Sequence, residues 1–161
     1  MNHGLAVQTR SERSHKALTY TNPEIVHRIA HDNGVSNNEA KAIFQDTLRF
    51  LVLCGAWSGA LRPTARIDIG WHAFLIFTRE YRQYCQEHFG HFIDHVPTPK
   101  LTVTDNSSRK ESAHNTLAGA RALFASDIAD AWAHEFGVNS SDCAPEPSCD
   151  SGSCCHDGNP G

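Results

Sequence analysis

The sequence predicts a small all-α domain of about four main helices, with a disordered N-terminal arm and a Cys-rich, disordered C-terminal tail. Apolar residues recur at three- and four-residue steps through most of the chain, which places them on one face of a helix. Residues that start and end helices stand at the ends of these runs. The length of 161 residues suits one domain. We therefore expect a helical domain over 21–138, an arm over 1–20 and a tail over 139–161.

The first helix is expected to begin directly after the arm. Asn22 can cap its N-terminus, and Pro23 suits the first helical turn because its fixed φ is already helical. Gly34 is expected to end the helix, since glycine readily takes the left-handed conformation of a C-cap.

The second helix is expected to open at Ser36, where Ser-Asn-Asn-Glu has the spacing of a capping box. It should be largely buried, because its apolar residues recur at helical spacing, and it should end near Gly55. The small-residue stretch 57–63 is interpreted as a loop.

The third helix is predicted as one long rod over 65–89, with Gly90 as its stop. On a wheel of about 100° per residue, its apolar side chains fall on one arc. This arc contains Trp71, Phe74, Leu75, Thr78, Tyr81 and Cys85.

A loop is expected over 91–108, because Pro97 and Pro99 exclude a regular helix there. Residues 101–103 could form a short extended piece inside it. The fourth helix is predicted over 116–136.

Composition excludes several classes of protein. The formal net charge is −4 and the pI is about 6.2, so the chain lacks the basic face that nucleic-acid binders carry, and we expect no nucleic-acid partner. No apolar stretch approaches the roughly 20 residues that a membrane span needs, and the polar N-terminus is no secretory signal. A cytoplasmic location with mostly reduced thiols is expected.

The strongest candidate for a functional site lies on the third helix, at Asp68, Trp71 and His72. Asp68 and His72 are four residues apart and so share a helical face. A carboxylate one turn before an imidazole can orient the ring, and the pair falls at the edge of the apolar arc, where a pocket could open. Three interpretations stay open: a carboxylate that merely satisfies a partly buried histidine, a binding site for a metal or ligand, and an acid–base catalytic pair.

A metal site needs a third or fourth ligand. Three histidines follow the helix, at His88, His91 and His95. Gly90 lets the chain turn back, and His95 is the best anchored of the three because Pro97 restricts the residues before it. The predicted set is Asp68, His72 and His95; the alternative is that the histidines coat a helix end, where cations suit the helix dipole.

The stretch from Asp68 to Gly90 resembles the core motif of the glycine-rich domain-containing protein-like family, in particular its short bacterial members. The matching positions are Asp68, Trp71-His72, Tyr81, Cys85 and Phe89-Gly90. The resemblance covers about residues 36–97 and implies a largely helical fold without an established activity. RNA binding is not carried over, because the extra parts of the plant relatives are absent. Phe74 stands where many relatives have a second histidine.

The tail holds a second group of candidate ligands, which are soft donors and favour zinc or copper. These are Cys143, Cys149, Cys154, Cys155 and His156. Their spacing is not that of a zinc knuckle. Two alternatives are a tail whose cysteines are modified by an enzyme and a solvated tail with incidental thiols.

The sequence lacks a nucleophile elbow, a phosphate loop, a dinucleotide fingerprint and a His-Glu-x-x-His helix. We therefore expect a non-enzymatic binding or accessory domain that is metal-associated through the Asp-x-x-Trp-His helix. A protein partner is possible, but the sequence does not identify it. The alternatives are a metal-dependent enzyme using Asp68, His72 and His95, and a precursor with a modified tail.

Overall fold

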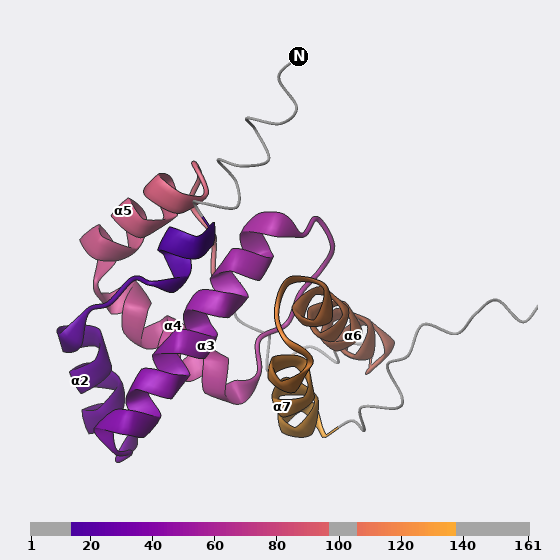
Figure 1. The fold of residues 1–161 in the computed structure, drawn as a ribbon, viewed down its shortest axis with the longest axis horizontal. Coiled ribbons are helices and arrows are strands. Elements are labelled where there is room, and N and C mark those ends of the chain that lie inside the picture. Colours follow the sequence, from indigo (N-terminus) through magenta and orange to yellow (C-terminus); the bar gives the residue numbers. More distant parts are fainter. Residues whose placement is uncertain (1–13, 97–105, 138–161) are drawn as a thin grey trace, which may run out of the picture.

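The computed structural model describes residues 14–96 and 106–137, and over these ranges the protein is all-α, as the sequence predicts. Figure 1 shows α3 running through the middle of the molecule, with α2, α4 and α5 on one side and α6 and α7 on the other. The helices are α2 (Pro23–Asn33), α3 (Asn37–Ala56), α4 (Ala65–Ile76), α5 (Thr78–His88), α6 (Asn106–Leu123) and α7 (Ser126–Phe136).

The ends of α2 and α3 confirm the local signals in the sequence. The Asn22 side chain accepts hydrogen bonds from the first turn of α2, and Gly34 ends it at φ 63°. The Ser36 side chain accepts from the backbone N–H of Glu39 at the start of α3. The Glu39 carboxylate bonds Arg66 instead of completing the capping box, and so ties α3 to α4.

The predicted rod over 65–89 is wrong as a single helix, because the chain breaks at Phe77 into α4 and α5. The indole N–H of Trp71 donates to the hydroxyl of Tyr81 at 2.9 Å, although the two residues are ten apart in sequence. In a straight helix, ten residues rise by about 15 Å. The fold-back at Phe77 instead lets apolar side chains of both short helices enter the same core.

The predicted single helix over 116–136 is also wrong. The structure has α6 and α7, joined at 124–125, and α6 begins at Asn106, inside the expected loop. Phe124 at the turn packs its ring against Trp132 of α7, with centroids 6.4 Å apart. The two helices bury one another (Figure 1), which a straight rod could not do.

The last part of the predicted arm over 1–20 is ordered, because residues 14–18 are helical. Ala17 is fully buried, and its carbonyl oxygen accepts a hydrogen bond from the Tyr84 hydroxyl at 3.2 Å. The Gln45 side chain donates to the carbonyl oxygen of Leu18. Residues 14–20 therefore pack against α3 and α5. The expected extended piece at 101–103 lies outside the described residues.

The contact between α3 and α4 positions the candidate site. A Cβ added at Gly70 would lie 2.1 Å from Oγ1 of Thr47, so the two helices approach more closely there than any other residue would allow. The Thr47 hydroxyl lies 3.2 Å from the carbonyl oxygen of Ile67. This interface fixes the first turns of α4. Among the described helices, none is long and apolar enough to cross a membrane.

Candidate metal centre

Asp68 and His72 lie one turn apart on α4, as their spacing predicts. Thr64 caps the helix by accepting from the backbone N–H of Ile67, which leaves Asp68 in the first turn. Nδ1 of His72 is 3.6 Å from Oδ2 of Asp68, an ion-pair distance rather than a hydrogen bond. The two groups point toward one another and form one side of the centre.

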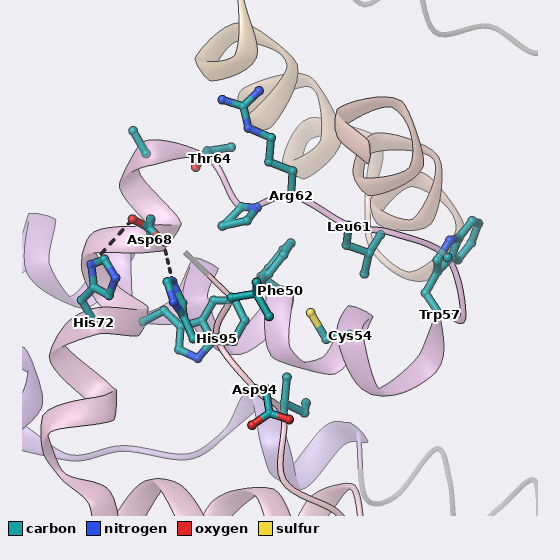
Figure 2. A pocket seen from close by; sticks show the side chains of 16 residues that line it. Phe50, Cys54, Trp57, Leu61, Arg62, Thr64, Asp68, His72, Asp94 and His95 are labelled. Carbon is teal, nitrogen blue, oxygen red and sulfur yellow. Dashed lines mark hydrogen bonds and ion pairs between the residues drawn. The ribbon is translucent and has the colours of Figure 1, made fainter. Parts of the chain in front are cut away.

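His95 arrives from the segment that follows α5 and completes the group. Its Nε2 lies 2.8 Å from Oδ1 of Asp68, and its ring centroid is 4.5 Å from that of His72. Figure 2 shows the two imidazoles on either side of the carboxylate. Donor atoms of Asp68, His72 and His95 all lie within 4.8 Å of one another. The structure thus brings together all three residues of the predicted metal set.

Burial increases through the three side chains. His72 is 56% exposed, Asp68 37% and His95 only 9%. The His95 ring stands edge-on to the indole of Trp71, with centroids 4.5 Å apart. The centre therefore lies where α4 meets the solvent, with His95 on its inner side. Trp71, predicted as a binding residue, is itself 96% buried and contacts the centre through its ring contact with His95.

A buried chain of hydrogen bonds holds His95 in this position. The Tyr81 hydroxyl accepts from Nε1–H of Trp71 and donates to the carbonyl oxygen of Ile93 at 2.7 Å. The Ile93 side chain is buried in the core, two residues before His95. Burial raises the pKa of Tyr81, so the phenol stays protonated and keeps its donor. Gly90, at φ 78°, makes the turn that brings this segment back, as the sequence predicts.

The other two histidines of this stretch do not join the centre. His91 is exposed, and its Nδ1 lies 3.2 Å from the carbonyl oxygen of Phe89. His88 is buried at the end of α5 against the ring of Tyr84, with centroids 4.7 Å apart. Of the three candidates, His95 alone lies beside Asp68 in the described part of the chain. The tail candidates Cys143, Cys149, Cys154, Cys155 and His156 lie outside the described residues.

A pocket of about 540 Å³ opens beside the three side chains. In Figure 2 Asp68, His72 and His95 lie at one end and Trp57 at the other, with Phe50 and Cys54 between them. Burial raises the pKa of Cys54 to about 12, so its thiol is neutral at physiological pH. Cys85 is fully buried, as expected of a core residue.

Sequence reasoning missed two features of this site. From the sequence, Tyr81 is predicted only as a packing residue. Its hydrogen-bond partners, Trp71 and Ile93, are ten and twelve residues away, and no local sequence pattern predicts these bonds. The pocket wall contributed by Trp57 and Leu61 was interpreted only as a loop of small residues. A Trp in such a loop is the one signal that the sequence offers for it.

A family model described as UCP032817-like matches residues 12–121 of the chain. No curated protein and no solved structure matches it. The resemblance to the glycine-rich domain-containing protein-like family is therefore wrong, since the match is to a different family and nothing points to the glycine-rich one.

Proposed function

We propose, for a chain that belongs to the UCP032817-like family, that Asp68, His72 and His95 bind a divalent transition-metal ion. The domain then acts as a metal-associated binding domain. One observation carries the proposal: three donor atoms from two separate segments converge within 4.8 Å. Helical periodicity explains why Asp68 and His72 lie close together, but it does not explain why His95 lies beside them.

The distances suit zinc after a small adjustment. Zn–N and Zn–O bonds are about 2.0–2.1 Å, so two donors at a tetrahedral angle lie about 3.4 Å apart. The 3.6 Å between His72 and Asp68 is close to this value. The 2.8 Å between Nε2 of His95 and the other carboxylate oxygen, Oδ1 of Asp68, is that of a direct hydrogen bond. An ion held by one of these oxygens would require a small turn of the carboxylate and would lengthen this distance by roughly 0.6 Å.

The chemistry of the donors favours zinc over copper(I). Two imidazoles and one carboxylate are borderline-to-hard ligands, whereas copper(I) prefers thiolate and thioether sulfur. The neighbouring thiol of Cys54 is held neutral by burial and does not belong to the group. The ring of His95 packs against Trp71, and the hydrogen bond from Tyr81 to the Ile93 carbonyl oxygen holds the segment that carries His95.

A metal-dependent enzyme using the same three residues is the second candidate. Three protein ligands leave a fourth position for water, as in catalytic zinc sites. The pocket beside the centre favours this candidate, since a substrate could reach such a water there. Asp68, His72 and His95 would all be ligands, and the bound water would be the nucleophile.

The test is a cobalt(II) titration, because cobalt(II) substitutes for zinc and absorbs visible light. The protein carries Cys143, Cys149, Cys154 and Cys155→Ser, so that no tail thiolate competes. We expect one equivalent of cobalt(II) to bind with a d–d spectrum of nitrogen and oxygen ligands. Asp68→Asn and His95→Ala should each lower the affinity by about 100-fold or more, because each removes a ligand.

Matched controls come from the same segment of chain. His91→Ala and Asp94→Asn remove a histidine and a carboxylate that lie outside the group, and should leave cobalt affinity unchanged. The proposal fails if the protein binds no cobalt(II), or if His95→Ala binds it as tightly as the parent. In that case the Asp68–His95 bond is structural, and His95→Ala shows only a stability loss of about 1–3 kcal/mol.

A further inference from the structure

The pocket extends well beyond the three ligands, and the extension is mostly apolar. Its volume of about 540 Å³ lies within the range of small-molecule sites. The metal group needs only one end of it (Figure 2). Most of the remaining wall comes from the apolar side chains of Phe50, Trp57, Leu61, Pro63 and Trp71 and from the thiol of Cys54, while Arg62, Thr64 and Asp94 add polar groups to it.

This apolar wall is held rigidly. The Phe50 ring is 99% buried, with centroids 5.6 Å from Trp71 and 6.5 Å from Trp132. Trp57 lies over two glycines, because a Cβ would come within 2.9 Å of its indole at Gly59 and within 3.3 Å at Gly119. The wall is therefore formed before any ligand arrives.

The loop that carries Leu61 is pinned to α6. The Thr116 hydroxyl accepts from the backbone N–H of Arg62 at 3.0 Å and lies 2.9 Å from its carbonyl oxygen. The Asn115 side chain donates to the carbonyl oxygen of Ala60. The guanidinium of Arg62 extends away from the centre, toward the ring of Phe136 (Figure 2).

The charge of the metal-loaded centre determines which chemical group of a small molecule would bind to it. A divalent ion with one carboxylate and two neutral imidazoles keeps a net charge of about +1 and an open coordination position. The three ligands border the pocket, so that position is reached from it. Arg62 and Asp94 also line the pocket, but the Arg62 guanidinium extends away from the three ligands and the Asp94 carboxylate lies apart from them (Figure 2), and the Cys54 thiol carries no charge.

We propose that the pocket binds a small organic molecule with an oxyanion head, such as a carboxylate or hydroxamate, and an apolar ring as its body. The head coordinates the metal, and the ring lies against Phe50, Leu61 and Trp57. This inference rests on the proposed metal site, because without the ion the oxyanion head of the ligand would face the negatively charged carboxylate of Asp68.

The test compares two hydroxamates on the cobalt(II)-loaded full chain, followed by the change in the cobalt spectrum. Benzohydroxamate carries a phenyl ring and acetohydroxamate only a methyl group. Because the ring gains an apolar wall, we expect benzohydroxamate to bind at least about tenfold more tightly. Trp57→Ala should lower this preference about fivefold and Leu61→Ala about threefold, with cobalt affinity unchanged.

Ile76→Ala is the matched control, since it removes an exposed apolar side chain of α4 that does not line the pocket. It should leave the preference intact. Equal affinity for the two hydroxamates, or an unchanged preference in both Trp57→Ala and Leu61→Ala, overturns the inference while the metal site stands. Failure of the metal site is seen earlier, as the absence of a cobalt spectrum before any hydroxamate is added, and it overturns both proposals.

Discussion

His95 and His88 stand on the same stretch of chain and both side chains are largely shielded from solvent, yet their surroundings differ. The side chain of His95 is 9% exposed and meets the carboxylate of Asp68 at 2.8 Å. His88 is buried, but its Nδ1 has no hydrogen-bond partner among the described residues. Burial by itself therefore does not mark a functional histidine. The difference lies in the hydrogen bond to a carboxylate that His95 makes with Asp68, whereas Nδ1 of His88 has no such partner.

The two tyrosines of α5 also form hydrogen bonds in different regions of the molecule. Tyr81 ties the His95 segment to α4 through Trp71 and Ile93. Tyr84 ties residues 14–18 to α5 through the carbonyl oxygen of Ala17. Each tyrosine thus anchors one region, and removing either hydroxyl should affect that region alone.

The largest effect is expected from Tyr81→Phe. Loss of the hydroxyl leaves the indole N–H of Trp71 and the carbonyl oxygen of Ile93 buried without this partner. We expect the free energy of unfolding to fall by about 2–4 kcal/mol. Cobalt affinity should fall about 10- to 100-fold, because His95 loses its positioning. Urea unfolding and cobalt titration measure the two effects; unchanged cobalt affinity would show that the hydrogen-bond chain does not position His95.

A smaller effect is expected from Tyr84→Phe, the matched variant in the other region. Only the carbonyl oxygen of Ala17 loses a donor, so the free energy of unfolding should fall by about 1–2 kcal/mol. Cobalt affinity should stay at the parent value. A loss of cobalt affinity as large as that of Tyr81→Phe would erase the distinction between the two regions.

The smallest effect is expected from the titration of His88. Burial lowers its pKa, and Lys16 lowers it further, while Glu87 opposes them in part. Since the folded pKa lies below the unfolded value of about 6.5, the unfolded chain binds the proton more readily. Stability should therefore be complete above about pH 6.5 and decline as the pH falls toward the folded pKa.

His88→Leu should make the dependence of unfolding free energy on pH shallower between about pH 7 and 5. His91→Leu serves as the control, since His91 is exposed and its removal should leave the slope unchanged. Parallel curves for the parent and His88→Leu would mean that His88 does not contribute to acid sensitivity.

The sequence by itself determined the features that depend on neighbouring residues. The ends of α2 and α3 follow from the capping side chains of Asn22 and Ser36 and from the left-handed Gly34. The meeting of Asp68 and His72 follows from helical periodicity. These are local effects, so a few residues suffice to specify them.

Only the tertiary structure decided where the helices break, and the candidate site depends on one of those breaks. A continuous helix from Asp68 to Phe89 would carry the chain about 32 Å away. The residues from Gly90 to His95 can span only about 20 Å in return. The long rod and the metal set with His95 were therefore incompatible predictions, and the break at Phe77 is what allows His95 to lie beside Asp68.

The residues around Phe77 contain no sequence signal that predicts this break. Phe77 is neither glycine nor proline, and no side chain caps α5 there. The chain turns because α4 and α5 bury more apolar surface when both face the same core, where the rings of Phe74 and Tyr81 lie 5.1 Å apart. Such burial is a property of the whole packed molecule, so it is decided by residues distant in sequence rather than by the residues at the bend.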